Sequence, residues 1–206
     1  MKTKERVLVV SLGLFNRFGE PNVTTLQIAD EMNISPGNLY YHYKNKKEII
    51  NELYLRFEAQ MTELLDVPEV EVSVEDHWLF LHLVFECIAS YQFLYKDLVN
   101  ILHRYEKIRT RFRRLLTRKH AAVMAVFDSL RAQGVMHASQ IEAEALCENV
   151  VLSITCWPGF DLIRQGRDDD QIQLARGCYQ IMSMVAPFLR EAEREQLQRL
   201  GQAYVV

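Results

Sequence analysis

The side chains best suited to chemistry gather in one short stretch, SPGNLYYHYKNK, which runs from Ser35 to Lys46. A helix turns by about 100° per residue, so a helix through this stretch places Leu39 and Tyr43 on one face, where they can pack against a core. The polar tips on the remaining surface belong to Asn38, Tyr41 and His42, with Tyr40 at the border. Amide, hydroxyl and imidazole groups form hydrogen bonds with phosphate oxygens and base edges. The stretch therefore predicts a nucleic-acid contact face.

Two sets of capping residues define the short helices that carry this face. Thr24 and Gln27 form an S/T-x-x-Q capping box, which predicts a helix over about residues 25–32. Ser35 can cap the next helix, with Pro36 at its first position, where a missing N–H costs nothing. Two short helices joined by a tight turn, the second with an exposed polar face, form a helix-turn-helix.

The flanking segments complete a small domain. Apolar residues repeat at helical spacing over residues 7–18, and Gly19 can end that helix. Asn45 can cap a fourth helix that reaches about residue 65. Lys46 lies in the first turn of this helix, where a cation is unfavourable unless an anion such as a phosphate shares the site.

These motifs resemble the N-terminal domain of the TetR family of bacterial repressors. The resemblance covers about residues 4–55 and rests on T-T-x-x-I-A followed by S-P-G-N-L-Y-Y-H-Y-K-N-K-K-E-I. It implies a double-stranded DNA operator, with phosphates held by Thr25, Tyr40, His42 and Lys46. Base contacts are implied for Gln27, Pro36, Gly37, Asn38 and Tyr41, and Ser35 joins them in the predicted DNA-binding set. Pro36 stands where many members carry a lysine or another polar residue, which removes one possible contact.

The remainder of the chain is helical in period. After a loop at DVPEVEVSVED, we expect helices over residues 75–92, 94–103, 106–133, 139–157 and 169–196. Gly134, the Trp157-Pro158-Gly159 sequence and the three aspartates at 168–170 are predicted to separate the last three. The fold class is therefore all-α, with a helix-turn-helix domain at residues 1–50 and a larger helical domain at 51–206.

The family resemblance implies that residues 51–206 bind a small-molecule effector and form a homodimer. Aromatic and polar side chains suit an apolar or aromatic ligand; the candidates are Trp78, His82, Phe85, His103, Phe112, Phe127, Asn149 and Trp157. For each aromatic residue, the alternative is that it fills an ordinary core.

The last predicted helix carries two apolar series about 200° apart, which indicates a second partner besides its own domain. One series runs through Ile172, Ala175, Tyr179, Met182, Ala186 and Leu189. The other runs through Leu174, Cys178, Ile181, Val185 and Phe188. With the apolar helix around residues 141–157, this pattern predicts a four-helix dimer interface. The alternative is that the chain itself covers the second series.

Residues 104–119 form the most basic run, RYEKIRTRFRRLLTRK. It can be a solvated helix face, the rim of an anion site or a contact with the DNA-binding domain.

Composition excludes several other classes. The chain has 206 residues and a net charge of −3, so it is not a globally basic nucleic-acid binder. The four cysteines lack CxxC spacing and are interpreted as core residues of a reducing compartment. His77, His82 and Cys87 do not converge on one helix face, so no zinc site is expected.

We also expect no membrane span, signal peptide, cofactor or metal. The apolar stretch at 78–95 is interrupted by polar residues, so it is interpreted as a buried helix. The chain shows no nucleophile–base set, so we predict a cytoplasmic regulator rather than an enzyme. A helical enzyme or ligand carrier, and an adaptor for protein partners, are the competing classes.

Overall fold

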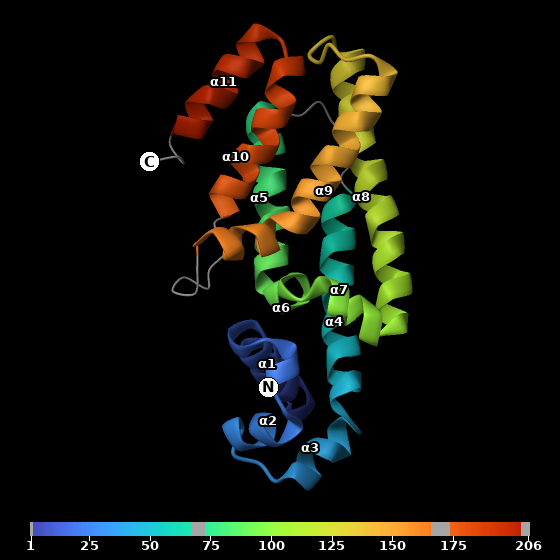
Figure 1. Cartoon of the computed structure of the whole chain (residues 1–206), viewed down its shortest axis with the longest axis vertical. Coiled ribbons are helices and arrows are strands. Elements are labelled where there is room, and N and C mark those ends of the chain that lie inside the picture. Colours follow the sequence, from blue (N-terminus) through green and yellow to red (C-terminus); the bar gives the residue numbers. More distant parts are fainter. Residues whose placement is uncertain (1, 67–72, 166–173, 203–206) are drawn as a thin grey trace.

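The computed structural model describes residues 2–66, 73–165 and 174–202, and its regular elements there are helices (Figure 1). The all-α class predicted from the sequence is confirmed. In chain order the elements are α1 Thr3–Phe18, η1 Glu20–Asn22, α2 Thr25–Glu31, α3 Pro36–His42, α4 Lys46–Leu65, α5 Val74–Ser90, α6 Gln92–Lys96, α7 Leu98–Arg104, α8 Glu106–Ala132, α9 Gln140–Gln165, α10 Leu174–Val185, η2 Ala186–Phe188 and α11 Glu191–Gln202.

The predicted caps define the N-terminal helices. Thr24 and Gln27 form the capping box, with the Gln27 N–H 3.2 Å from Thr24 Oγ1 and the Thr24 N–H 2.8 Å from Gln27 Oε1. Ser35 Oγ accepts a hydrogen bond from the Asn38 N–H at 3.2 Å. Gly19 ends α1 with a φ of 80°, a left-handed conformation that glycine adopts without a Cβ clash.

The first four helices pack around a shared apolar centre. Phe15, Ile28, Leu39 and Ile49 are fully buried, and they come from α1, α2, α3 and α4 respectively. Burial of one apolar face on each helix fixes α3 across the bottom of the molecule in Figure 1.

Helix α4 joins the two parts of the chain. It packs against α1 at one end and against α5 and α8 farther along. The predicted domain boundary at residue 50 lies inside α4, so the two parts share one continuous helix (Figure 1).

The larger part is a bundle in which α5, α8, α9 and α10 pack against one another, with α11 across its far end (Figure 1). The single helix predicted over 94–103 is wrong, because the chain forms α6 and α7 with a break at Asp97. Gly134 separates α8 from α9 with a φ of 67°, as expected. The aspartates at 168–170 lie outside the described residues.

Two prolines behave differently from the prediction. The break predicted at Trp157-Pro158-Gly159 is wrong, because α9 continues through Pro158 to Gln165 and changes direction instead (Figure 1). The single helix predicted over 169–196 is also wrong. At Pro187 the chain leaves α10, forms η2 and starts α11, as expected for a residue that lacks an N–H.

The apolar residues of α10 are largely covered by the chain itself. In the described part of both series, Cys178, Ile181, Met182, Val185 and Leu189 are buried. Ile172 lies outside the described residues, and nothing is described of the Leu174 side chain. The alternative that the chain itself covers the second series therefore applies to most of the apolar surface of α10.

Helix α9 instead exposes an apolar stripe. Ile141, Leu152, Phe160 and Ile163 are 79%, 58%, 55% and 85% exposed, and they recur with helical spacing. Cys156 is exposed on the same stripe, which corrects the expectation that all four cysteines are core residues.

Among the described helices, only α9 is long and apolar enough to cross a membrane by length and composition. Because α9 packs against α6, α8 and α10, we interpret its apolar residues as core and interface. The stretch at 78–95, considered as a possible span from the sequence, is divided between α5 and α6.

Candidate nucleic-acid interface

Helix α3 has two faces of opposite character. Leu39 and Tyr43 are buried, with exposed fractions of 0% and 4%. Tyr41 is 86% exposed and Asn38 is also exposed. Neither of these two side chains packs into the core, so this face is available to an external partner.

Side-chain contacts organise the rest of the surface. The Thr25 and Tyr40 hydroxyls lie 2.9 Å apart, which connects the start of α2 to α3. The half-buried His42 contacts the Tyr41 ring edge to face, with centroids 5.1 Å apart. Gln27 is exposed, but its Oε1 is occupied by the capping box, so only the amide NH₂ remains to read a base.

The start of α3 is open. Ser35, Pro36 and Gly37 are all exposed. A Cβ on Gly37 would lie 3.9 Å from Ser35 Oγ, an ordinary contact, and Gly37 does not have a positive φ. Nothing within the chain therefore requires glycine here, which favours the prediction that backbone approaches an external partner at this point.

Lys46 has a different environment from the one predicted. Its ammonium group donates to the carbonyl oxygens of Glu20 at 2.8 Å and Val23 at 2.9 Å, and it forms an ion pair with Glu20 Oε1 at 2.9 Å. These three oxygens match the three protons of the ammonium group. A phosphate contact by Lys46 would require an exchange of partners, because the residue already holds the turn before α2.

Two exposed lysines outside the predicted DNA-binding set lie beside this surface. Lys44 follows α3 and Lys47 lies in the first turn of α4. Residues 1–50 carry seven basic and five acidic side chains, a net charge of +2, whereas the whole chain has −3. The positive charge is therefore local to the part of the chain that presents α3.

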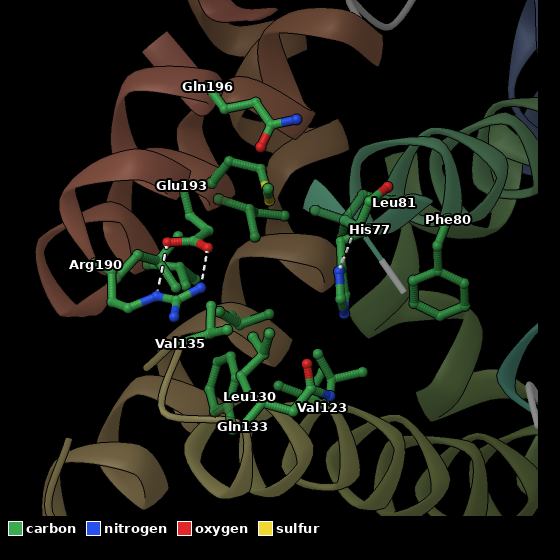
Figure 2. Close-up of a pocket in the computed structure, with 18 residues that line it drawn as sticks. His77, Phe80, Leu81, Val123, Leu130, Gln133, Val135, Arg190, Glu193 and Gln196 are labelled. Atoms are coloured by element: carbon green, nitrogen blue, oxygen red, sulfur yellow. Dashed lines mark hydrogen bonds and ion pairs between the residues drawn. The ribbon is translucent and has the colours of Figure 1, made fainter. Parts of the chain in front are cut away.

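A cavity of about 330 Å³ lies at the opposite end of the molecule, between α5, α8, α10 and α11 (Figure 2). Its wall is mainly aliphatic and aromatic, with Ser73, His77, Gln133, Arg190, Glu193 and Gln196 as polar members. Arg190 forms an ion pair with Glu193, and its Nε lies 3.1 Å from Glu193 Oε2. The apolar members are Phe80, Leu81, Val123, Val126, Phe127, Leu130, Val135, Val150, Ile181, Met182, Val185 and Leu189.

Of the eight predicted ligand residues, the structure places Phe127 on this cavity. Trp78, Phe85, Phe112 and Trp157 are buried elsewhere, His82 is half-buried, and His103 and Asn149 are exposed. Phe85 and Trp157 pack so closely around Gly177 that a Cβ there would lie 3.0 Å and 2.8 Å from their rings. The sequence shows which aromatic residues face inward, but not which of them meet other side chains and which border an empty volume.

Comparisons with known proteins agree with this geometry. Residues 7–53 match the family described as bacterial regulatory proteins, tetR family, and residues 56–197 match the family described as bacterial transcriptional repressor. A TetR-family transcriptional regulator from Marinobacter aquaeolei VT8 is 35% identical to the chain, covers 99% of both chains and superposes with a TM-score of 0.88. The chain belongs to the TetR family.

More distant relatives agree. The probable acrEF/envCD operon repressor of Escherichia coli K12 is 29% identical over 65 residues, which are 32% of this chain and 29% of that protein. The chain therefore matches less than a third of the length of this curated relative. A transcriptional regulator from Aquifex aeolicus VF5 has the same fold, with a TM-score of 0.61 at 21% identity over 97% of this chain and 99% of its own.

The basic run of this TetR-family protein forms a largely exposed face, with Ile108, Phe112 and Leu115 buried on the other side, and several of its arginines have acidic partners. Arg104 forms an ion pair with Glu20 in the helix-turn-helix part, at 2.5 Å. Arg111 pairs with Glu58 of α4, and Arg118 lies 2.5 Å from Asp66. Of the alternatives left open by the sequence, contact with the DNA-binding part therefore applies to Arg104.

One lysine of α8 is buried in the bundle. Lys119 is 1% exposed, and its ammonium group lies 3.1 Å from the Tyr95 hydroxyl. Loss of hydration lowers the pKa of Lys119 to about 8. Burial raises the pKa of Cys87 to about 11, so the thiol stays neutral at physiological pH. Within the described residues, no three His, Cys, Asp or Glu side chains lie close enough together to hold a metal ion.

Proposed function

We propose that this TetR-family protein is a dimeric transcriptional repressor that binds duplex DNA through α2 and α3 and is released by a small apolar molecule. The observation that carries the DNA-binding part is the two-sided character of α3. Leu39 and Tyr43 hold the helix against its domain, while Asn38 and Tyr41 project from the other side. A helix held in this way presents amide and phenol groups to base edges, and nearby hydroxyls to phosphates.

The cavity at the far end supports the ligand-responsive part. About 330 Å³ falls within the range of small-molecule sites, and a mainly apolar wall with few polar groups favours an apolar or aromatic ligand. His77 and Gln133 would then orient the ligand through hydrogen bonds. A ligand changes DNA affinity only if it binds one arrangement of the protein better than the other.

The exposed stripe on α9 supports the dimer. Leu152, Phe160 and Ile163 form an apolar surface that the described part of the chain does not cover. Gly159 on the same helix has open space around its Cα, which permits close approach of a second helix. A two-fold dimer places two α3 helices against successive major grooves, so the operator would be palindromic.

Repression is proposed rather than activation because the Escherichia coli relative is described as a repressor. A DNA-binding role implies a cytoplasmic location. The competing classes, a helical enzyme or carrier and a protein adaptor, would use the cavity or the α9 stripe but would leave the exposed tyrosine of α3 unexplained.

A gel-shift titration with a random duplex pool tests the proposal. Wild type should bind, and affinity should fall steeply as salt rises, because phosphate contacts release counterions. Tyr41→Ala should weaken binding. Val99→Ala removes side-chain atoms at an 81% exposed position of α7 and serves as the control with unchanged binding. Binding that is insensitive to both salt and Tyr41→Ala would refute DNA recognition by α3.

A further inference from the structure

A buried carboxylate connects the two parts of the molecule. Glu20 lies in the turn between α1 and α2, and its side chain is fully buried. Glu20 Oε1 accepts a hydrogen bond from the Tyr105 hydroxyl at 2.9 Å and lies 2.9 Å from Lys46 Nζ. Glu20 Oε2 forms an ion pair with Arg104 at 2.5 Å. Arg104 and Tyr105 form the junction between α7 and α8, so the two groups come from the larger domain.

Burial makes this contact cooperative. A buried carboxylate is stable only while donors and cations replace its lost hydration, so the loss of one partner weakens the position of the others. Burial and the adjacent Glu20 carboxylate raise the pKa of Tyr105 well above its usual value, which keeps the phenol protonated and able to donate. The cluster therefore favours two discrete arrangements, engaged or released, over a gradual change.

Arg104 already has a second carboxylate within reach. Its Nη2 lies 3.3 Å from Asp97 Oδ2, in the short segment between α6 and α7. Arg104 is 39% exposed, and Asp97 is 27% exposed. Arg104 can therefore leave Glu20 and keep an ion pair at a more hydrated site, which lowers the cost of the released arrangement.

The cluster also lies directly before the DNA-binding helices. Lys46 holds the carbonyl oxygens of Glu20 and Val23, and Val23 precedes the residue that caps α2. Asn16 provides a second anchor, since its Oδ1 accepts from the Phe93 N–H at 3.1 Å at the start of α6. The larger domain thus holds the end of α1 through Asn16 and the turn before α2 through Glu20.

Helix α8 extends from this cluster to the cavity. Tyr105 immediately precedes α8, and Val123, Phe127 and Leu130 in its second half line the cavity wall. Because α8 is one continuous helix of 27 residues, it directly connects the cavity wall with the residues that contact Glu20 at its start.

We propose that the Glu20–Arg104–Tyr105 contact is the switch that couples the cavity to the DNA-binding helices. The inference rests on the proposed function. In the DNA-bound arrangement the cluster is engaged and fixes the turn before α2. In the ligand-released arrangement, Arg104 pairs with Asp97 alone and the turn before α2 is no longer held.

The test needs no knowledge of the ligand, because coupling between two sites is reciprocal. Hydrogen–deuterium exchange is measured on the full chain, with and without a duplex selected from a random pool. In wild type, DNA should slow exchange at residues 24–46 and also at residues 98–108. At 98–108 the exchange rate should fall by about fivefold or more, because about fivefold is the lower end of the coupling factors typical of linked sites. Arg104→Gln should keep the first effect and lose the second.

Arg111→Gln is the matched control. It removes the same charge from the first turns of α8, close to Arg104, and the Arg111 side chain has a similar exposed fraction of 46%. Its partner Glu58, however, lies on α4 rather than in the helix-turn-helix. This control should keep both effects. Glu20→Gln should reproduce Arg104→Gln from the opposite side of the contact.

The two proposals fail in different ways. If no duplex is selected and exchange at residues 24–46 is unchanged, the proposed function is wrong. If residues 24–46 are protected but 98–108 are unchanged in wild type, the switch is refuted while DNA binding stands. Equal protection of 98–108 in Arg104→Gln and Arg111→Gln also refutes the switch.

Discussion

Replacing Lys119 by methionine is expected to stabilise the protein. The lysine is 1% exposed, and its described polar partner is the Tyr95 hydroxyl, a neutral group. A buried ammonium without a carboxylate partner loses much of its hydration energy without full compensation. Methionine has a similar length and flexibility and fills irregular core space without a charge.

The size of the effect follows from the pKa of Lys119, which falls from 10.5 to about 8. Each pKa unit corresponds to about 1.36 kcal/mol, so the burial of the charged form costs about 3 kcal/mol at pH 7. The substitution also removes the hydrogen bond to Tyr95, a loss of about 1 kcal/mol. The net gain in free energy of unfolding should be about 2 kcal/mol at pH 7.

The pH dependence gives a second test. The folded pKa lies below the unfolded value, so the folded protein binds fewer protons between about pH 8 and pH 10.5, and wild-type stability rises with pH in that window. The advantage of Lys119→Met over wild type should therefore shrink by about 1 kcal/mol between pH 7 and pH 9.

Urea unfolding at pH 7 and pH 9 measures both quantities. Lys107→Met, at an exposed position of the same helix, is the control and should change stability little at either pH. A Lys119→Met protein that is less stable than wild type at pH 7 would show that the buried ammonium does not destabilise the fold. So would an advantage that does not depend on pH.

Three further predictions follow from the interface, the dimer stripe and the cavity. Gly37→Ala should raise the free energy of unfolding by up to about 1 kcal/mol, because alanine has the higher helix propensity, yet it should weaken DNA binding about tenfold. Unchanged binding in gel shifts would refute a close approach of the backbone to DNA. The double variant Leu152→Glu, Ile163→Glu should be a monomer at micromolar concentration in sedimentation equilibrium, whereas the control Val99→Glu should remain a dimer. If the double variant also remains a dimer, the α9 stripe is not the interface. Val126→Trp should fill part of the cavity and lower the affinity for a naphthalene-sulfonate dye, measured by fluorescence, by about tenfold, or about 1.4 kcal/mol. An unchanged dye affinity would place the dye outside the cavity.

Features set by neighbouring residues were predictable from the sequence. The capping box of Thr24 and Gln27 and the burial of Leu39 and Tyr43 depend on spacings of three and four residues, and the structure has both. Such contacts form within one or two helical turns, so the sequence pattern contains all the information they need.

Features set by distant partners were not predictable. Glu20 meets Arg104 and Tyr105 across more than 80 residues, and no local pattern indicates that pairing. The same long-range context explains why Pro158 bends a helix while Pro187 ends one. It also decides that Phe127 borders a cavity while Trp157 packs against Gly177.

Sequencing the duplexes selected by wild type and by Asn38→Ala from one random pool tests DNA recognition most directly. Wild type should enrich an inverted repeat whose half-sites lie about 34–36 Å apart, or a multiple of that distance. Asn38→Ala should lose preference at one position in each half-site, with a cost of about 1–3 kcal/mol on the wild-type consensus. The absence of any enriched sequence, or the same consensus for both proteins, would contradict base recognition by α3.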